Sequence, residues 1–571
     1  MKVIIVGGVA GGATAAARAR RLDETAQIIV FERGEHVSFA NCGLPYYIGG
    51  VIEKRSSLFV SSKAAIEGKY DLEVRDRSDV RSIDRDRKTV TVTDLRTGDS
   101  YEESYDKLVL STGSSPFVPP MPGGEADNVF TLWTIPDTDA ISAYIQAHAP
   151  RRATVVGAGF IGLEMVGNLA ELGMEVTLVE LMDQVMPPLD PDMAKLLSNQ
   201  LVTQGVGLRL GVGVSQLRDD GHTVVLDDGS SFDTDLVLLS VGVRPNNQLA
   251  KDAGLELGPR GHVTVDEFQA SSDPDIYAVG DVVEVSDPIL GARTAIPLAG
   301  PANRQGRAVA ANALGSSAPE PYAGSIGTSV TKVFDLTAAA TGHSEKSLQR
   351  AGKVYGTDYH VALVHPMSHV GYYPGATPMT LKLIFGADGA VLGAQIVGFD
   401  GVDKRIDVIA TSIHFRGSVT DLAQLELAYA PPYGAAKDPV NFAGMVAGNI
   451  LSGLSRPVLF REYIEDPSRW QVLDVREPAE TAGGMLPGAV NIALGELRGR
   501  LDELTTDTEY LVNCAVGLRG YLAERMLTQR GFKVRNLAGG WRTYAEQLAD
   551  TDHPVPDRVE PRTTQDVTRP S

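Results

Sequence analysis

The chain has 571 residues, 43% of them hydrophobic and 22% charged, with a formal net charge of −20. This length exceeds what one hydrophobic core supports, so we expect three or four domains with the residue balance of a soluble globular protein. The negative charge argues against nucleic acid as a bulk partner, and no apolar run is long enough to cross a bilayer. The two cysteines cannot form a disulfide framework, which indicates a reducing, cytoplasmic compartment. The strand-like run that starts at Lys2 predicts that no signal peptide is present.

The N-terminal segment predicts a strand–helix–strand unit, with VIIVGG, a helix of small residues and IIVFE. Gly7 and Gly12 hold the first and third positions of a dinucleotide-binding turn, but Val9 holds the second. Glu32 stands where a carboxylate would bind a ribose. By itself the pattern fits either a nucleotide site or an ordinary turn. The candidate cofactor residues of this unit are Gly7, Gly8, Gly11, Gly12, Glu32 and Arg33.

The next segment, residues 38–47, contains the first cysteine, Cys42. Tyr47 stands five residues later, and the only other cysteine is Cys514, so an internal disulfide at this segment is impossible. Cys42 must therefore cycle through a mixed disulfide, a persulfide or a sulfenic acid. We expect a helix that begins near Cys42 to lower its pKa and favour the thiolate. The alternative is a buried, inert cysteine.

A second strand–helix–strand unit begins at Ala153 and carries Gly157, Gly159 and Gly162 in the full glycine pattern. Phosphate is expected at the helix N-terminus, where free amides favour negative charge. Glu180 ends the next strand, where it would accept a ribose hydroxyl and repel a 2′-phosphate, so we favour NADH over NADPH. Glu164, in the helix, is a further candidate for cofactor contact.

A later strand-and-glycine segment, residues 275–281, ends in Gly280 and Asp281, an acid suited to the ribityl chain of a flavin. Together with Ser111, Thr112 and Gly113, this set resembles the two-dinucleotide-binding flavoprotein disulfide reductases across residues 1–450. The resemblance implies FAD on the first unit and NAD(P)H on the second. It also assigns cofactor contacts to Thr112, Gly113, Gly280, Asp281 and Ala299.

Around Cys42 the sequence is similar to coenzyme A-disulfide reductases and their persulfide-reducing relatives, with single-cysteine NADH oxidases and peroxidases as cousins. Arg18 and Arg21 lie on one face of the first helix, three residues apart, and Lys69 follows. These charges suit the phosphates of coenzyme A, although an ordinary solvated helix face is the alternative. The expected substrate contacts are Arg18, Arg21, Ser38, Asn41, Lys69, Asn303, Arg304 and Lys437.

Two tyrosine-bearing segments, residues 426–437 and 372–374, look like dimerisation-domain segments of this family. The resemblance implies that tyrosines of the partner subunit cover the cysteine and protonate or stabilise a leaving thiolate. We assign this role to Tyr429 first, to Tyr373 second, and to Tyr433 after them. Without the resemblance, such tyrosines are more often packing residues.

The second cysteine lies in a strand–loop–helix segment, LVNCAVGLRG. With DVREP upstream and LAGGW downstream, this set resembles single-domain rhodaneses over about 90 residues. The loop amides and helix N-terminus would stabilise a thiolate or a terminal persulfide. The Cys-x4-Arg loop is one residue shorter than that of cysteine phosphatases, which favours sulfur over phosphate. The candidate residues are Cys514, Ala515, Val516, Gly517, Leu518 and Arg519.

These signals predict an α/β protein with two Rossmann-like dinucleotide-binding domains, an α+β dimerisation domain and a C-terminal α/β rhodanese-like domain. The expected borders are 1–150 with 251–327 for the FAD-binding domain, 151–250 for the NAD(P)H-binding domain, 328–453 for the dimerisation domain, 456–550 for the rhodanese-like domain, and 551–571 for a disordered tail.

The combined interpretation is a cytoplasmic homodimer whose active site is shared between subunits. It would use NADH, or NADPH, and FAD to reduce coenzyme A disulfide, coenzyme A persulfide or polysulfide at Cys42. Cys514 would exchange sulfur with sulfane-sulfur donors. An NADH oxidase or peroxidase that uses a cysteine sulfenic acid, and a non-enzymatic sulfur carrier or redox sensor, remain alternatives. No metal, nucleic acid or membrane is expected to take part.

Overall fold

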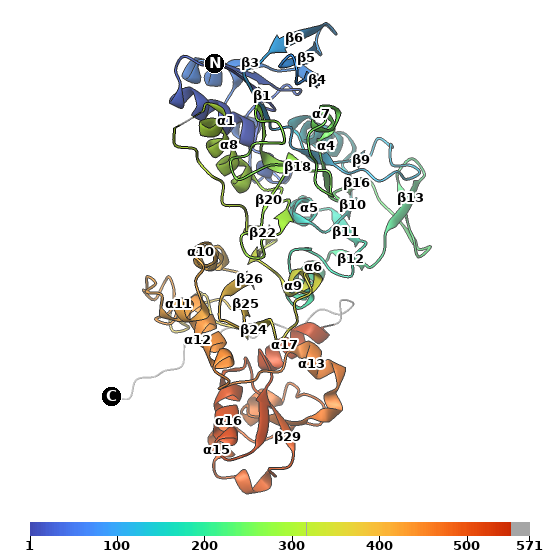
Figure 1. The fold of residues 1–571 in the computed structure, drawn as a ribbon. Coiled ribbons are helices and arrows are strands. Elements are labelled where there is room, and N and C mark those ends of the chain that lie inside the picture. The colour runs from blue at the N-terminus through green and yellow to red at the C-terminus, as the bar shows by residue number, and fades with distance from the viewer. Residues whose placement is uncertain (316, 550–571) are drawn as a thin grey trace, which may run out of the picture. The chain divides into compact units, whose positions relative to one another are not determined.

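The computed structural model describes residues 1–315 and 317–549 (Figure 1). They form two compact units: Met1–Leu181 with Val212–Gly327, and Met182–Gly211 with the chain from Thr328 onward. Residues 182–211, expected in the NAD(P)H-binding domain, therefore pack within the second unit. The domain borders stay predictions, and the expected disordered tail lies outside the described residues.

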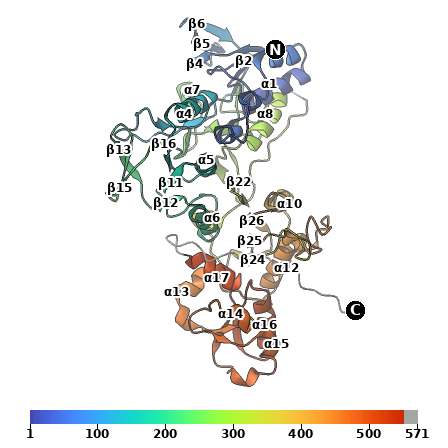
Figure 2. The ribbon, with the colours of Figure 1, turned by 180° about the vertical axis from the view of Figure 1, so that it is seen from behind.

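A parallel sheet in the order β19-β7-β1-β2-β3 forms the first dinucleotide-binding half. Its apolar strands are buried on both faces, as in other parallel sheets. Helices α1, α3 and α8 pack on one face and the antiparallel sheet β4-β5-β6 on the other, and Figure 1 and Figure 2 both show α1 beside α8. The bounds are β1 Lys2–Val6, α1 Ala10–Leu22, β2 Gln27–Phe31, α3 Lys63–Tyr70, β3 Glu73–Arg75, β4 Ser78–Asp84, β5 Thr89–Asp94, β6 Ser100–Ser104, β7 Lys107–Leu110, β19 Ile276–Ala278 and α8 Ala299–Ala313.

The second half repeats this plan, with parallel strands in the order β11-β10-β16-β9. Helix α5 contacts β10 and β11, and the antiparallel sheet β13-β14-β15 packs against the same strands. The bounds are β9 Val129–Phe130, α4 Ile135–His148, β10 Arg152–Val156, α5 Phe160–Glu171, β11 Glu175–Glu180, β13 Val214–Arg218, β14 Thr223–Leu226, β15 Ser231–Asp233 and β16 Leu236–Leu239.

Short elements connect these two halves. Strands β8 and β17 pair antiparallel, and β18, β20 and β21 form a small sheet that packs on the first half. The bounds are η1 Asn41–Gly43, α2 Leu44–Ile48, η2 Arg55–Leu58, β8 Ser114–Pro116, β17 Val243–Pro245, α7 Gln248–Asp252, β18 Val263–Thr264, η3 Gly280–Val282, β20 Val283–Ser286 and β21 Arg293–Thr294.

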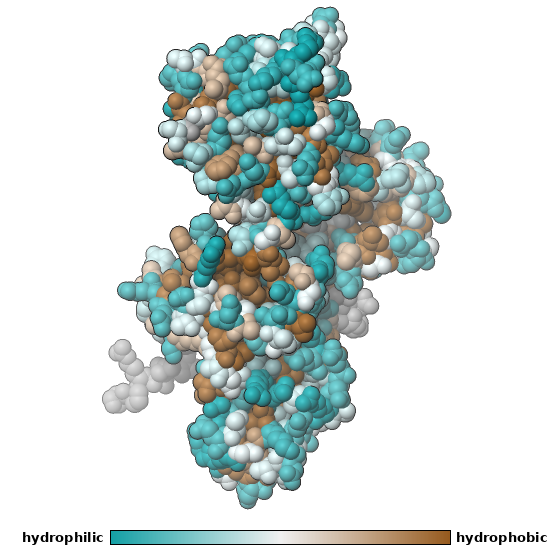
Figure 3. Space-filling model, in the orientation of Figure 1, coloured by the Kyte–Doolittle hydropathy of each residue, from teal (hydrophilic) through white to brown (hydrophobic). Residues whose placement is uncertain are grey.

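The second unit begins with α6 and contains an antiparallel sheet in the order β22-β23-β26-β25-β24. Apolar surface gathers in the region of this sheet in Figure 3, while the residues of β25 are themselves buried along the whole strand. The bounds are α6 Pro191–Thr203, β12 Gly207–Leu210, β22 Ser329–Val333, β23 Leu336–Gly342, α9 Glu345–Arg350, β24 Tyr359–Val364, β25 Met379–Gly386, β26 Val391–Gly398, α10 Val402–His414, α11 Val419–Gln424 and α12 Pro439–Leu451.

The C-terminal part of this unit is a parallel sheet in the order β28-β27-β29-β30, with helices packed around it. The expected fold class is confirmed in all its parts. The bounds are α13 Phe460–Glu465, η4 Pro467–Arg469, β27 Gln471–Asp474, α14 Pro478–Thr481, β28 Val490–Asn491, α15 Leu494–Leu497, η5 Leu501–Glu503, β29 Glu509–Asn513, α16 Leu518–Thr528, β30 Lys533–Asn536 and α17 Gly540–Leu548.

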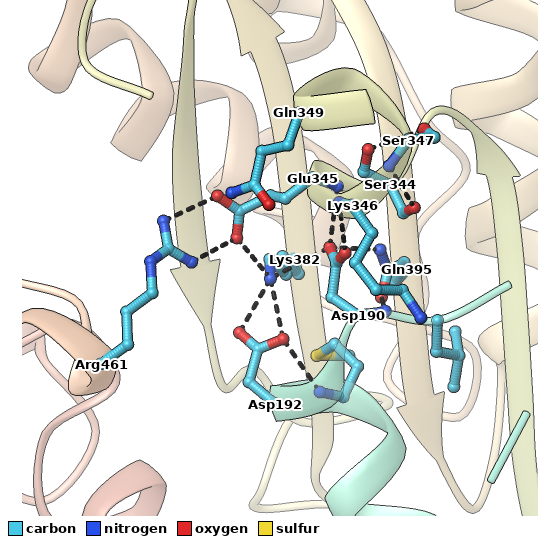
Figure 4. Close-up of polar contacts among 12 residues, drawn as sticks. Asp190, Asp192, Ser344, Glu345, Lys346, Ser347, Gln349, Lys382, Gln395 and Arg461 are labelled. Carbon is cyan, nitrogen blue, oxygen red and sulfur yellow. Dashed lines mark hydrogen bonds and ion pairs between the residues drawn. The ribbon is translucent and has the colours of Figure 1, made fainter. Parts of the chain in front are cut away.

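A buried ionic cluster joins four segments of the second unit (Figure 4). Lys382 of β25 is 1% exposed, and its Nζ lies 3.1 Å from Asp190, 2.8 Å from Asp192 and 2.7 Å from Glu345. Arg461 of α13 binds both carboxylate oxygens of Glu345, at 2.6 and 2.7 Å. Burial alone would lower the pKa of Lys382, but the three carboxylates outweigh it and raise that pKa. The start of α6, strand β25, α9 and α13 are therefore held together by complementary charges.

Replacing Lys382 with methionine should destabilise this unit, because Asp190 and Asp192 would lose the ammonium group that pairs with them and Glu345 would keep only Arg461. Removing one partner of a buried ion pair costs about 3–5 kcal/mol, so the thermal midpoint should fall clearly below that of wild type. Lys332→Met, at an exposed lysine of β22 in the same sheet, is the matched control. Equal midpoints for both variants would contradict the role of the cluster.

The pH dependence has a defined sign. Lys382 has a raised pKa, while the carboxyls of Asp190 and Glu345 have lowered pKa values because Lys382 outweighs their burial. The cluster's contribution should be fully present between about pH 4.5 and about pH 10. It should be lost as the pH falls through the lowered carboxyl pKa values or rises through that of Lys382.

Candidate functional site

A glycine turn leads from β1 into α1. Gly7 has a φ of +102°, and a Cβ atom there would lie 2.1 Å from the carbonyl oxygen of Ser111. A Cβ atom on Gly12 would lie 1.8 Å from the carbonyl oxygen of Gly7. Only glycine allows these approaches, which bring the N-terminus of α1 to the carboxyl edge of the sheet. Val9, at the departing second position, is the partly exposed N-cap residue of α1.

The carboxylate of Glu32 lies at the same edge. Its Oε2 accepts a hydrogen bond from the N–H of Gly8 at 2.8 Å, and its Oε1 accepts one from the N–H of Gly34 at 2.7 Å. The neighbouring Arg33 is exposed. The backbone therefore holds Glu32 beside the glycine turn, where a ribose carboxylate is expected.

Asp281 lies in η3, the short turn that follows β19. Its carboxylate accepts a hydrogen bond from Ser114 Oγ at 2.7 Å, and burial raises its pKa. The preceding residue, Gly280, has a φ of +80° and donates its N–H to Gln305 of α8 at 2.7 Å. Thr112 Oγ1 instead donates to the carbonyl of Asn246 at 2.7 Å. Gly113, with a φ of +64°, and Ala299, the first residue of α8, complete this predicted set.

The second glycine turn repeats the first. A Cβ on Gly157 would lie 2.4 Å from the carbonyl oxygen of Ser240, and one on Gly162 would lie 1.9 Å from the carbonyl oxygen of Gly157. A Cβ on Gly159 meets nothing within 4 Å, so the approach to the N-terminus of α5 is open there. Glu180 Oε2 accepts the N–H of Ala158 at 2.7 Å, as Glu32 does in the first half.

Cys42 lies in η1, directly before α2, and the residue as a whole is exposed, although neighbouring atoms partly shield its sulfur from solvent. Desolvation of the sulfur by the surrounding walls raises the pKa of the thiol, and the carboxylates of Glu164 and Asp281 raise it further. The expectation that a helix lowers this pKa is therefore wrong for the protein chain. The physical reason is that α2 has only five residues, while two carboxylates face the sulfur.

Contacts between α2 and α5 explain how Glu164 comes to face Cys42. Tyr46 Oη donates to Glu164 Oε1 at 3.3 Å, and a Cβ on Gly49 would lie 2.0 Å from Asn168 Oδ1. The helix that follows the nicotinamide-type glycine turn thus packs on the cysteine segment. Burial and Glu164 raise the pKa of Tyr46 to about 12, which keeps its hydroxyl protonated. The sequence-based analysis did not assign Tyr46 a role.

The predicted basic face of α1 is partly neutralised. Arg18 Nη2 lies 3.1 Å from Glu320, which also lies 3.9 Å from Arg307 of α8. Arg21 is exposed, and Lys69 Nζ lies 5.1 Å from the centre of the Tyr70 ring. The sequence-based analysis missed Glu320 and Arg307 because no local pattern brings them to α1.

The remaining predicted substrate contacts divide into two groups. Ser38 and Asn41 are tied to the cofactor half: the Ser38 N–H donates to Gly8 O at 3.0 Å, and Asn41 Nδ2 donates to Trp133 O at 3.3 Å. The other three residues are exposed: Asn303 and Arg304 on α8, and Lys437 before α12.

Two of the exposed tyrosines pair in the second unit. Tyr372 Oη and Tyr429 Oη are 2.8 Å apart, and this hydrogen bond raises the pKa of Tyr429. Tyr373 instead stacks edge-on against His369 at 5.6 Å, and Tyr433 is 72% exposed. Tyr429, the first choice for the predicted role, therefore has a hydrogen-bond partner, Tyr372, that the sequence-based analysis did not predict. Sequence position alone does not decide which of the adjacent Tyr372 and Tyr373 reaches it.

Arg405 of α10 binds residues in or next to the two tyrosine segments, 372–374 and 426–437. It is 2% exposed and pairs with Asp438, the N-cap residue of α12, at 3.1 Å. Its Nη2 also donates to the carbonyl of Ser368 at 2.8 Å and to that of Tyr433 at 3.5 Å. One buried guanidinium therefore binds both segments.

Cys514 follows β29 directly and is 1% exposed. The N–H of Gly517 donates to its Sγ at 3.1 Å, and Gly517 has a φ of +94° at the N-cap of α16. The loop formed by Ala515, Val516, Gly517 and Leu518 thus directs the N–H of Gly517 at the sulfur, as expected for a site that stabilises negative charge.

Charged pairs fix this loop from two sides. Arg519 binds both oxygens of Glu480 at 2.6 Å, which lowers the pKa of Glu480 to about 2. Arg476 pairs with the buried Asp474 at 2.7 Å, and Asp474 also accepts from Asn513 at 2.9 Å. The sequence-based analysis identified Asp474 and Arg476 as part of a motif but not their pairing with each other.

Models of three protein families match the chain. The pyridine nucleotide-disulphide oxidoreductase model covers residues 1–306, its dimerisation domain covers 328–438, and the rhodanese-like domain covers 459–547. The chain belongs to the pyridine nucleotide-disulphide oxidoreductase family. It is therefore a flavoprotein oxidoreductase that uses FAD and NAD(P)H, and the alternative of a non-enzymatic carrier is wrong.

Relatives extend the similarity along almost the whole chain. A coenzyme A disulfide reductase of Staphylococcus haemolyticus (strain JCSC1435) is 35% identical over 79% of this chain and 100% of its own. The crystal structure of reduced Bacillus anthracis CoADR-RHD is 49% identical, with a TM-score of 0.93 over 96% of this chain and 98% of its own. An NAD-dependent persulfide reductase from A. fulgidus is 39% identical, with a TM-score of 0.89 over 95% of this chain and 100% of its own. A water-forming NADH oxidase from Lactobacillus brevis is more distant, at 30% identity and a TM-score of 0.75 over 80% of this chain and 99% of its own.

The residues present fit both cofactors. Each glycine turn presents a helix N-terminus and a carboxylate at the carboxyl edge of its sheet, and the space in front of Gly159 is open. The flavin-type half adds the buried carboxyl of Asp281 between Ser114 and α8. Gly7, Gly12 and Glu32 would hold FAD, while Gly157, Gly162 and Glu180 would hold NAD(P)H.

Arg405→Met should release both tyrosine segments, because it leaves Asp438 buried without its cation and frees the carbonyls of Ser368 and Tyr433. We expect faster amide hydrogen exchange in residues 367–377 and 426–438, measured by mass spectrometry. Exchange in the sheet around Cys514 should stay unchanged, and Arg416→Met, at an exposed arginine, is the control. Unchanged exchange in both tyrosine segments would show that Arg405 does not hold them.

Proposed function

We propose that this chain is an NADH-dependent flavoprotein that reduces the sulfur–sulfur bond of coenzyme A disulfide and coenzyme A persulfide at Cys42, in the cytoplasm. The observation that carries the proposal is the isolation of Cys42. It is the only cysteine of the first unit, and it stands beside Glu164 of α5, next to the second glycine turn. Relatives named as coenzyme A disulfide reductase and NAD-dependent persulfide reductase support the substrate class.

At Cys42 the reaction begins with disulfide exchange. The thiolate attacks one sulfur of coenzyme A disulfide, the sulfur–sulfur bond breaks, and one coenzyme A thiolate leaves with the electron pair. Cys42 then holds the other coenzyme A in a mixed disulfide. When bound, FAD supplies the two-electron chemistry that carries reducing equivalents from NAD(P)H to this bond. Burial and Glu164 disfavour the thiolate of Cys42 in the chain alone. Whether Cys42 is a thiolate would therefore depend on the cofactor and substrate that bind next to it.

The dimerisation domain supports a homodimer, and we propose that Tyr429 and Tyr372 of one subunit serve the Cys42 site of the other. A leaving thiolate needs a proton, and a tyrosine hydroxyl with a raised pKa retains one at neutral pH. Arg18, Arg21 and Lys69 would bind the phosphates of coenzyme A, with Glu320 displaced from Arg18 by the ligand.

Cys514 would transfer sulfane sulfur. Its thiolate attacks the outer sulfur of a donor such as thiosulfate, the donor's sulfur–sulfur bond breaks, and sulfite leaves with the electron pair. A persulfide remains on Cys514, held by the loop N–H groups. A coenzyme A thiolate then takes the terminal sulfur and returns Cys514 to a thiolate, which yields the persulfide substrate of Cys42.

The decisive experiment compares NADH oxidation with several acceptors: coenzyme A disulfide, coenzyme A persulfide, polysulfide, oxygen and peroxide. Cys42→Ser should abolish reduction of the coenzyme A acceptors while the flavin stays bound and is still bleached by NADH. The physical reason is that the described part of the first unit offers no second thiol.

Cys514→Ser is the matched control for this panel. It should leave coenzyme A disulfide reduction unchanged and impair only oxidation driven by thiosulfate with coenzyme A. Faster turnover with oxygen or peroxide than with every coenzyme A acceptor would favour an NADH oxidase or peroxidase and refute the proposal.

Glu180 should make NADH the better donor. A charge-assisted hydrogen bond to the ribose is worth about 1–3 kcal/mol, so Glu180→Ala should lower kcat/KM for NADH by roughly 5- to 150-fold. The value for NADPH should stay the same or rise, because a repelling carboxylate is removed. Glu175→Ala, at the opposite end of β11, is the control, and an NADPH preference in the unmodified chain would refute the assignment.

A further inference from the structure

The N-terminus of α17 supports the cysteine loop of the rhodanese-like domain. The first N–H groups of a helix have no partner within it. In α17, the N–H of Trp541 donates to the carbonyl of Cys514 at 2.7 Å, and that of Arg542 donates to the carbonyl of Ala515 at 3.0 Å. These two bonds fix the direction of the loop peptides. The orientation of α17 therefore affects which way the loop N–H groups point, including that of Gly517 toward the sulfur.

Two glycines let α17 come this close to the loop. A Cβ on Gly540 would lie 2.2 Å from the carbonyl oxygen of Cys514 and 3.1 Å from the nitrogen of Gly517. A Cβ on Gly539 would lie 2.0 Å from Thr543 Oγ1 and 2.7 Å from His365 Nε2. The turn before α17 is thus packed against the cysteine loop through Gly540 and against His365 through Gly539.

His365 does not belong to the rhodanese-like domain. It directly follows β24 of the antiparallel sheet, yet its Nε2 lies 2.7 Å from Thr543 Oγ1 on α17. Its Nδ1 lies 2.9 Å from Thr380 Oγ1 on β25. The imidazole, 8% exposed, bridges two buried hydroxyls that come from different domains. Burial lowers the pKa of His365 well below its ordinary value, so it acts as a neutral hydrogen-bonding group and not as a charge.

Helix α6 holds the other end of α17, and both ribbon views draw the two helices side by side (Figure 1, Figure 2). Asn199 Nδ2 donates to the carbonyl of Glu546 at 2.9 Å, and Gln547 Nε2 donates to the carbonyl of Asp192 at 2.8 Å. Among these side-chain hydrogen bonds from outside the rhodanese-like domain, that of His365 lies nearest to the cysteine loop, since Thr543 lies in the first turns of the helix.

We infer that His365 is a positioning residue of the sulfur-transfer site: through Thr543 it sets α17, and through α17 it sets the loop around Cys514. This inference rests on the proposed sulfur transfer by Cys514. It means that a side chain of the dimerisation domain completes the support of the rhodanese-like site.

The test uses four variants in two matched pairs. A glutamine amide reaches the position of the imidazole Nε2, whereas an asparagine amide reaches only that of Nδ1, so His365→Gln keeps the bond to Thr543 and His365→Asn loses it. Thr543→Ser keeps the hydroxyl and Thr543→Val removes it at nearly constant shape. All are made in the full chain, and thermal midpoints are recorded to show that the Asn and Val variants are folded.

Two rates are measured for each variant. The first is transfer from thiosulfate to cyanide, in which Cys514 releases sulfite, holds the sulfane sulfur and passes it on as thiocyanate. The second is alkylation of Cys514 by iodoacetamide in a Cys42→Ser background, where Cys514 is the only cysteine. The second rate needs no sulfur donor and no flavin chemistry, so it stays informative even if the proposed reductase function fails.

We expect His365→Asn and Thr543→Val to slow transfer by about tenfold or more, because a displacement of about 1 Å away from the chemistry can cost about 100-fold. The rate of Cys514 alkylation should also change in these two variants. In His365→Gln and Thr543→Ser, both rates should stay near those of wild type. Coenzyme A disulfide reduction should be unaffected in the His365→Asn chain. Wild-type rates in the Asn and Val variants would overturn the inference, and so would equal impairment in all four.

Discussion

Close backbone approaches that only glycine permits underlie all three sites of this chain. Gly7 approaches the carbonyl of Ser111, Gly157 that of Ser240, and Gly540 that of Cys514, each at a distance that a Cβ atom would close to 2.1–2.4 Å. At Gly7 and Gly157 the approach brings a helix N-terminus, with its free N–H groups, to the edge of the sheet where a nucleotide phosphate is expected. At Gly540 the N–H groups that begin α17 instead donate to the carbonyls of Cys514 and Ala515 and so support the cysteine loop. The three predicted sites therefore share close packing of a glycine on a carbonyl, next to a parallel sheet.

This shared solution also explains what the sequence predicts well. The glycine turns, Glu32, Glu180 and the Cys514 loop are local patterns, because strand, turn and helix follow one another within a short stretch of chain. The fold class follows from the same repeats. The pKa of Cys42 was predicted with the wrong sign, because desolvation of the sulfur and the charge of Glu164 both raise it, and the packing of α2 on α5 that brings Glu164 near is encoded by no local pattern.

The contacts that the sequence did not predict join residues far apart in the chain. Glu320 meets Arg18, Tyr372 meets Tyr429, and His365 meets Thr543 across two domains. Buried charges do the same for larger segments, as Lys382 and Arg405 show. Unlike apolar contacts, such bonds require particular directions and partners, so they fix which segments meet at the expense of desolvating ions. Residue types alone do not reveal this, since most lysines and arginines in the chain lie at the surface.

The two cysteines obtain their charge in opposite ways. Cys514 has a backbone N–H donor already directed at its sulfur, so the loop is prepared for negative charge before any substrate arrives. At Cys42, desolvation of the sulfur and the charges of Glu164 and Asp281 outweigh the hydrogen bond from the residue's own backbone N–H, so the pKa is raised and the chain by itself favours the neutral thiol. A thiol that stays protonated until cofactor and substrate are in place is protected from adventitious oxidation, because the thiolate is the form that reacts. In the proposed reactions, the fold would thus prepare Cys514 for negative charge, whereas Cys42 would depend on its ligands for it.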